Sequence, residues 1–293
     1  MTVNLVLALL FGVLTATVNA ISVIAQHIAS SRLPSTGRGW RFVLDLARQP
    51  LWLLGGLALF GSLVFQALAL HFGPIGLVQP LLISELVLAL LIRWLWLHQP
   101  VRMITIISSV ITTALLTLFI IFASPSSGQE KSSASLWVIT LAVSSLVIAG
   151  LIFGARSGSV RRRAGLFGIA TAIAWALEAV FIKVLTDSIT TFGYVGTVSH
   201  WPLYAFILCG GVGLYCEQAA LHVGPLSVSQ PFIVIVDPLV SVLLGVVLFA
   251  ERWRGGPSHL IAGVVILMAI SVSAWVLIVT GPESMTAHTP EVH

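Results

Sequence analysis

Charged residues are scarce in this chain of 293 residues. Asp, Glu, Lys and Arg make up 8% of the sequence, whereas ordinary soluble domains carry roughly a quarter. Hydrophobic residues make up 58%. A soluble protein of this composition would lack the polar side chains needed to cover its surface. The composition therefore excludes a soluble globular protein and predicts a chain embedded in lipid.

Cysteines are few, and the common catalytic signatures are absent from the sequence. Cys209 and Cys216 fall on one predicted helix, about 10 Å apart along its axis, which is too far for a disulfide. The chain has no Gly-rich phosphate loop, no His-Glu-x-x-His, no Gly-x-Ser-x-Gly and no Cys-x-x-Cys. We therefore expect neither an enzyme nor a cofactor, and any uphill transport would have to use an ion gradient.

Long apolar runs occupy most of the chain. A helix needs about 20 apolar residues to cross the hydrocarbon of a bilayer, and a membrane barrel would show short alternating segments instead. The predicted spans are 3–29, 50–70, 75–97, 102–123, 135–155, 165–186, 201–221, 226–249 and 258–280. The sequence thus predicts an all-α integral membrane protein with about nine transmembrane helices.

The positive charges predict the orientation, because cytoplasmic loops carry an excess of Lys and Arg. With nine spans, one side of the membrane receives Arg32, Arg38, Arg41, Arg48, Arg93, Arg102, Arg156, Arg161, Arg162 and Arg163. The other side receives Lys131, Lys183, Arg252 and Arg254. We expect the N-terminus outside and the C-terminus in the cytoplasm, in the plasma (inner) membrane. A further short helix within 30–49 would reverse the N-terminus. The net charge of +4 reflects this topology and implies no nucleic-acid partner.

One phrase of the sequence occurs twice. Residues 69–80 and 220–231 both read Ala-Leu-His-x-Gly-Pro and then continue to Gln-Pro. Segments 1–4 thus align with segments 6–9, and segment 5 has no partner. Equivalent helices are five crossings apart, an odd number, so the halves form an inverted repeat. We predict a first repeat at 1–123, an external loop, linker helix and basic cytoplasmic loop at 124–164, a second repeat at 165–280, and a disordered tail at 281–293.

Four acidic residues fall inside predicted spans: Glu85, Glu178, Glu217 and Asp237. Ionisable groups within a membrane are costly and usually face a cavity or a partner. The repeat alignment places Glu85 and Asp237 at nearly equal depth in the two halves. This predicts a cation or proton site at the midplane, and the alternative is a carboxyl group bonded to a neighbouring helix. Both interpretations stay open for Glu178, whereas for Glu217 we favour a structural bond.

The first segment carries a polar stripe. Its residues share one helix face at spacings of four and three, and they are Thr15, Asn19, Ser22 and Gln26. The stripe predicts either hydrogen bonds between helices or a wall of the substrate cavity. Lys183 is expected to reach the outer headgroups or to meet Asp187.

Prolines interrupt two of the predicted spans. Pro80, Pro231 and Pro238 each remove a backbone donor from an apolar helix. A kink at Asp237-Pro238 would place a free carbonyl beside a carboxylate, which is an arrangement that can coordinate a cation. The alternative is a kink that serves packing alone. His71 and His222 fall at the matched turns and are expected to cap helix ends.

Asp237-Pro238-Leu239 places a proline in mid-helix, and Ala250-Glu251-Arg252 places a glutamate at the helix end. With this motif the sequence resembles, over most of the chain, the drug/metabolite transporter (EamA-like) superfamily. In the first half, His98-Gln99 replaces the terminal Glu. The nine-span layout is most similar to the NIPA-like magnesium-transporter branch, which has Ala-Pro or Gly-Pro turns before segments 3 and 8. The resemblance implies small-solute transport and, for that branch, Mg²⁺ as the substrate.

These observations lead us to expect a secondary transporter that moves a small solute by alternating access, coupled to protons or cations at Glu85 and Asp237. One alternative is a divalent-cation permease with Glu85, Glu178 and Asp237 as oxygen ligands, of which Glu85 and Asp237 are the first metal-ligand candidates. Another is a non-transporting membrane partner or lipid-handling subunit. The expected partners are the substrate and the bilayer, and a homodimer stays open.

Overall fold

A computed structural model describes residues 4–31, 48–97, 102–123, 125–126, 133–224, 226–253 and 257–280. Most of the predicted 30–49 loop, most of the 124–134 stretch and all of the 281–293 tail lie outside these residues, as do the side chains of His27 and His222. Almost all of the described chain is helical.

Ten helices and one short strand pair make up this part of the chain. The helices are α1 (Leu5–Ser31), α3 (Pro50–Phe72), α4 (Ile75–Leu82), α5 (Ser84–Leu97), α6 (Met103–Ala123), α7 (Ala134–Gly154), α8 (Val160–Val198), α9 (Trp201–Val223), α10 (Leu226–Phe249) and α11 (Pro257–Thr280). Strand β1 (Pro125–Ser126) pairs antiparallel with β2 (Arg252–Trp253). With α4 and α5 together forming the third span, the described residues contain nine apolar segments long enough to cross a membrane, as predicted.

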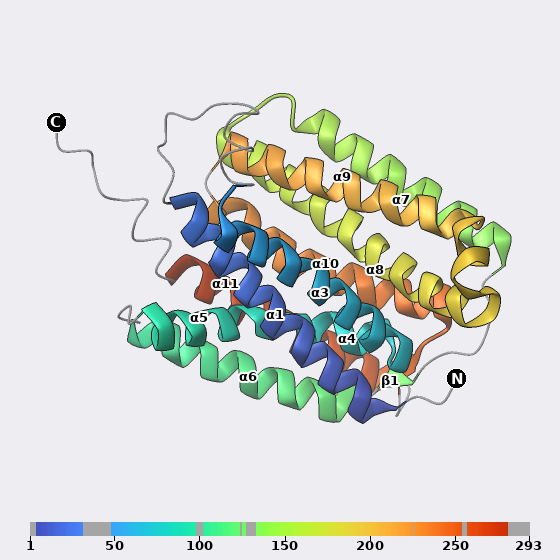
Figure 1. The fold of residues 1–293 in the computed structure, drawn as a ribbon, viewed down its shortest axis with the longest axis horizontal. Coiled ribbons are helices and arrows are strands. Elements are labelled where there is room, and N and C mark those ends of the chain that lie inside the picture. The colour runs from blue at the N-terminus through green and yellow to red at the C-terminus, as the bar shows by residue number, and fades with distance from the viewer. Residues whose placement is uncertain are drawn as a thin grey trace.

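The helices run roughly along one axis and give the bundle two ends (Figure 1). We call the end where α1 begins the amino end. The opposite end, the arginine end, carries Arg48, Arg93, Arg102, Arg156, Arg161, Arg162 and Arg163. Helices α1 and α8, the first helices of the two repeats, run in opposite directions (Figure 1). This is the inverted arrangement that an odd number of intervening crossings requires.

Neighbour relations repeat between the halves. Helix α1 packs along α3 as α8 packs along α9, and α5 lies against α1 as α10 lies against α8. Helices α6 and α11 pack on each other, where Thr112 Oγ1 donates to Ser273 Oγ at 2.8 Å and Ser273 Oγ donates to the Ser108 carbonyl at 3.0 Å. The unpaired helix α7 packs mainly on α8.

Close contacts at glycines follow the same alignment. A Cβ atom at Gly12 would meet Leu81, and one at Gly168 would meet Ser229 and Phe232. The two turn glycines also match, since each cap amide donates to the carbonyl four residues earlier, Gly73 to Ala69 and Gly224 to Ala220. The duplicated phrase therefore builds the same turn and the same close helix contact in each half.

We expect Gly168→Ala to destabilise the protein by about 1–3 kcal/mol, the usual effect of overpacking. The new methyl group would lie 2.8 Å from the backbone oxygen of Ser229, and a backbone atom inside a packed helix cannot turn aside. Thermal unfolding of the purified protein in detergent measures the effect. Gly56→Ala is the matched control, because a Cβ there has no neighbour within 4 Å. Equal melting temperatures for the two variants would contradict the expectation.

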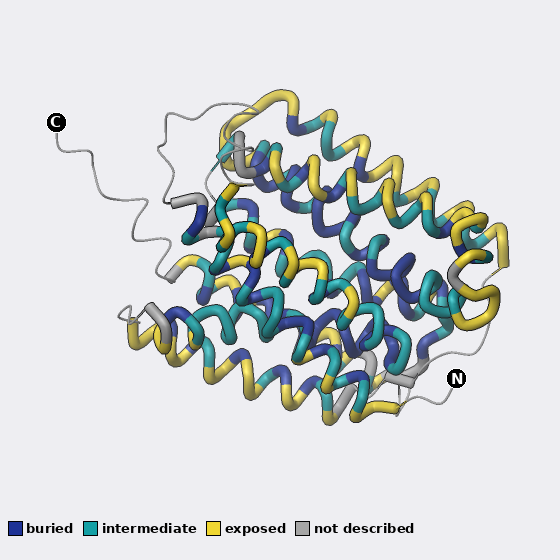
Figure 2. The backbone as a smooth tube through the Cα atoms, viewed as in Figure 1, coloured by how far each residue is buried: buried dark blue, intermediate teal, exposed yellow. Residues whose placement is uncertain are grey.

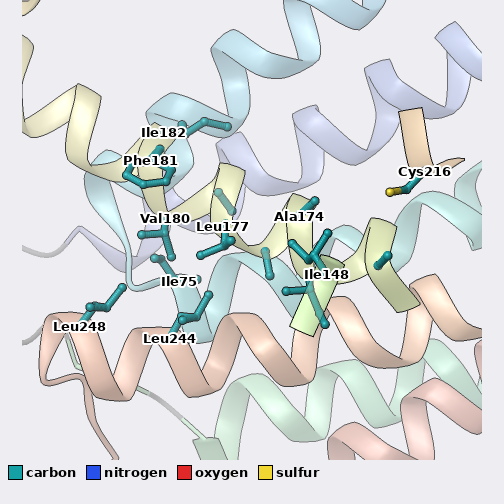
Figure 3. Packing of buried hydrophobic residues seen from close by; sticks show 14 of the residues in the cluster. Ile75, Ile148, Ala174, Leu177, Val180, Phe181, Ile182, Cys216, Leu244 and Leu248 are labelled. Carbon is teal, nitrogen blue, oxygen red and sulfur yellow. The ribbon is translucent and has the colours of Figure 1, made fainter. Parts of the chain in front are cut away.

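Large apolar side chains cover the outside of the bundle. Exposed residues gather along α6, α7 and α9 (Figure 2), and they include Val110, Val138, Leu146, Phe153, Leu208 and Leu214. In water such a surface would aggregate, whereas in lipid it meets a solvent of its own polarity. The interior instead centres on α8, whose Ala174, Leu177 and Phe181 belong to the main buried cluster (Figure 3). The chain is thus an integral membrane protein.

Candidate functional site

The ladder of helical hydrogen bonds in the third span is interrupted at its middle, where Ile83 itself keeps helical backbone angles. Pro80 cannot donate to the carbonyl of Gly76, helix α4 ends two residues later, and the amide of Ile83 donates to the carbonyl of Pro80 at 3.2 Å in a tight turn. Helix α5 then begins at Ser84, so Glu85 lies in its first turn. The amides at a helix N-terminus favour negative charge. The break therefore provides a polar backbone environment for a carboxylate inside an apolar span.

Glu85 connects three helices of the first half. Its Oε2 accepts a hydrogen bond from Asn19 Nδ2 of α1 at 2.7 Å. Ser62 of α3 donates to Asn19 Oδ1 at 3.4 Å and to the Leu59 carbonyl at 2.8 Å. Glu217 of α9 lies within range of an electrostatic interaction with Glu85. The first-half carboxyl group is therefore both bonded within its own half and coupled to an acid of the second half.

Asp237 has a similar position in α10. Its Oδ1 accepts from Ser241 Oγ, one turn further along the same helix, at 3.1 Å. Glu178 of α8 lies within range of an electrostatic interaction with Asp237. Helix α10 continues through Pro231 and Pro238 to Phe249, so these prolines do not divide this span as the third span is divided. Pro238 nevertheless leaves the carbonyl of Val234 without its usual intrahelical donor.

Longer-range electrostatic interactions link the four predicted acids two by two, Glu85 with Glu217 and Asp237 with Glu178, and we call these the two pairs. All four side chains are partly buried. The carboxyl group of Glu178 points toward the α9 backbone, where a Cβ at Gly210 would lie 3.1 Å from its Oε1. Two carboxylates within electrostatic range repel each other when both are ionised. A proton or a cation bound at either pair would therefore relieve this repulsion.

The polar stripe of α1 serves two purposes. Ser22 Oγ donates to the Gly55 carbonyl of α3 at 2.7 Å, and Gln26 Nε2 donates to Ser22 Oγ at 3.0 Å. Thr15 Oγ1 donates to the Phe11 carbonyl of its own helix at 2.8 Å. Asn19 alone in the stripe bonds to one of the four acids. Ser22 and Gln26 are thus part of the α1–α3 interface, which was the first of the two predicted roles.

The structure does not assemble a metal site from the predicted ligands. Within the described residues, no group of three or more His, Cys, Asp or Glu side chains is placed to hold a metal ion together. Glu85, Glu178 and Asp237 accordingly do not converge on one point in this conformation. Joint ligation of a bare Mg²⁺ ion by these three residues therefore has no support from this geometry.

Lys183 was predicted to reach the outer headgroups, but its side chain is buried between the two halves. It is 8% exposed, and its Nζ donates to the carbonyls of Leu70 and Gly73 at 2.8 Å each. Asp187 contributes an electrostatic interaction, yet its Oδ1 is buried without a hydrogen bond. The lysine prefers carbonyl oxygens at the end of α3 because the helix packing brings them within reach. Sequence reasoning did not include this contact between the halves.

Glu251 is a second residue that joins the two halves, and the sequence did not predict its contact. It is 3% exposed, and its carboxylate accepts hydrogen bonds from the amides of Ile75 at 2.7 Å and Gly76 at 2.9 Å. Burial raises its pKa, while the Gly76 amide, the charge of Lys183 and the Ile75 amide act in the opposite direction. The sequence signal that could have pointed to Glu251 is its place in the motif of a mid-helix Pro followed by a Glu at the helix end.

Comparisons with known proteins give one relative and no assigned activity. The chain is 25% identical over 268 residues to an uncharacterized protein of Corynebacterium glutamicum, covering 91% of this chain and 93% of that protein. No family model matches the chain. No solved structure matches it either. The chain is therefore similar along almost its whole length to a bacterial protein of comparable size.

Proposed function

We propose that this protein is a secondary transporter that moves a small solute across the membrane by alternating access, coupled to protons or cations. The observation that carries the proposal is the two pairs of acids inside a bundle of two inverted halves. One pair, Glu85 and Glu217, belongs to both halves. A charge or proton bound there would respond directly to a movement of one half against the other.

Energetics favour a working role for these acids over a structural one. Each carboxyl group inside a membrane protein costs free energy, and a scaffold gains nothing from four of them. Glu85 also lies beside the interrupted hydrogen-bond ladder of the third span, and in transporters the substrate and ion sites are commonly formed by discontinuous helices near the midplane. The resemblance to the drug/metabolite transporter superfamily points the same way. We assign Asn19 the role of positioning the Glu85 carboxyl group.

The orientation forms part of the proposal. The arginine end faces the cytoplasm under the positive-inside rule, which puts the amino end outside. Tag accessibility in intact cells tests this assignment, and a cytoplasmic N-terminus would contradict it.

Proteoliposomes test the transport function. Purified protein is reconstituted with a pH-sensitive dye inside, and small organic cations, amino acids, sugars and MgCl₂ are added outside in turn. We expect the wild-type protein to take up at least one organic solute together with protons. This uptake should collapse when the proton gradient is removed. Correctly folded protein that moves neither protons nor any solute of the panel would favour a non-transporting subunit. Uptake restricted to Mg²⁺ would favour the divalent-cation permease.

A further inference from the structure

The turn between α3 and α4 is held from both sides by charged residues of the other half. Lys183 of α8 donates to the last carbonyls of α3, at Leu70 and Gly73, and Glu251 accepts from the first amides of α4, at Ile75 and Gly76. A cation thus meets the C-terminus of one helix and an anion meets the N-terminus of the next. Both placements are favoured by the helix dipoles.

The surroundings make these bonds difficult to break. Ile75 packs among Val180, Leu244 and Leu248 of the second half (Figure 3). The Lys183 ammonium also lies 5.8 Å from the centre of the Phe249 ring. In such an apolar setting charge-assisted hydrogen bonds are strong, and an unpartnered charge or backbone group is costly. The four bonds therefore hold the halves together as one unit.

The backbone around Glu251 is arranged to deliver its carboxylate to the turn. Ala250 has φ of +49°, a left-handed conformation that turns the chain at the end of α10. The Glu251 amide donates to the Gly245 carbonyl at 3.2 Å. A Cβ at Gly245 would lie 2.5 Å from Glu251 Oε2, so glycine is the residue that leaves room for the carboxylate. Directly afterwards β2 pairs with β1, which follows the last helix of the first half.

The arginine end does not carry the same charges in its sequence. The equivalent turn there has the same cap, in which Gly224 donates to the Ala220 carbonyl, and Gly224 faces Ala164 as Gly73 faces Ala8. In the repeat alignment, however, His27 stands where the second half has Lys183. Gln99 stands near the position of Glu251. In the sequence, the lysine and glutamate at these positions, Lys183 and Glu251, thus occur only in the second repeat.

We propose that Lys183 and Glu251 form a latch that closes the amino end and that must release before this end can open. The inference rests on the proposed function, because a release is needed only if the halves move. In this structure the latch holds the amino end closed, and its release is expected to favour opening at that end. The latch residues act on the access equilibrium and not on the solute.

Spin-label distances test the latch without any transport assay. Cys209 and Cys216 are replaced by alanine, and nitroxide pairs are placed at exposed positions of the two halves. Val6 with Val195 reports on the amino end, and Leu54 with Val160 reports on the arginine end. We expect Lys183→Met and Glu251→Gln to lengthen the amino-end distance by about 5 Å, the scale of a one-turn helix shift, and to shorten the arginine-end distance. Each Glu251 oxygen accepts from a different amide, and glutamine replaces one of these oxygens with an NH₂ donor that cannot accept.

Gly245→Ala provides an independent and milder variant. Its methyl group displaces the Glu251 carboxylate while every charge of the chain is kept, so it decides the question even if the charge variants fail to fold. Lys131→Met, which removes the only other lysine of the sequence, and Gly56→Ala are the matched controls and should leave both distances unchanged. An unchanged amino-end distance in folded Gly245→Ala protein, or an equal shift in the controls, would overturn the latch. If the latch is confirmed but the protein shows no flux, the proposed transport function is rejected and the latch is not.

Discussion

Glu85→Gln is expected to reduce coupled flux in proteoliposomes by at least about tenfold, since the loss of a single interaction of about 1.4 kcal/mol already has that effect. Glutamine keeps the size of the side chain and can still bond to Asn19, but it can neither carry a proton nor bind a cation by charge. The negative charge that faces Glu217 from the first half is lost. The measurement is initial solute uptake under an imposed proton gradient, at several pH values.

A structural role for Glu85 predicts a different result. If the carboxyl group served only as a bond to α1, Glu85→Gln would keep normal flux, because the amide oxygen still accepts from Asn19 Nδ2. We expect Glu85→Asp, which keeps the charge, to retain part of the flux and its pH dependence. Asp237→Asn should behave like Glu85→Gln. Glu291→Gln, in the tail outside the described residues, is the control. Normal flux in both Glu85→Gln and Asp237→Asn would remove the pair from the mechanism.

Lys183→Met is expected to lower the free energy of unfolding by about 3–5 kcal/mol, the range for a buried charge whose partner is removed. Methionine fills a similar volume but leaves the carbonyls of Leu70 and Gly73 without their donor. It also leaves the Glu251 carboxylate without the nearby positive charge. The measurement is reversible unfolding of the purified protein by urea in detergent.

A double-mutant cycle separates the latch from ordinary loss of packing. Glu251→Gln alone should also destabilise the protein, because one of the two amides at the start of α4 loses its acceptor. The combined variant should cost less than the sum of the two single changes, since neither charge is then left without its counterpart. Strict additivity would show that the two residues act independently, which contradicts a shared latch. Lys183→Arg, which keeps the charge and donors, should recover part of the stability.

Much of the candidate site was visible in the sequence. Acidic residues inside apolar spans stand out without any structure, and the duplicated phrase aligns Glu85 and Asp237. The division of the polar stripe was not visible, because Asn19 and Ser22 share one face of α1 and only the packing of α5 and α3 assigns them their partners. The pairing of Glu85 with Glu217 also needs two helices far apart in sequence.

The sequence by itself determined that this is a lipid-embedded protein of about nine helices in two inverted halves. Hydropathy and repetition are local properties, and an odd number of crossings leaves one relative direction for the halves. Only the tertiary structure decided that Lys183 and Glu251 bind a turn of the other half. Their partners are backbone atoms more than one hundred residues away, and backbone atoms carry no sequence signal. Helix packing alone brings such groups together, and burial then makes their hydrogen bonds strong.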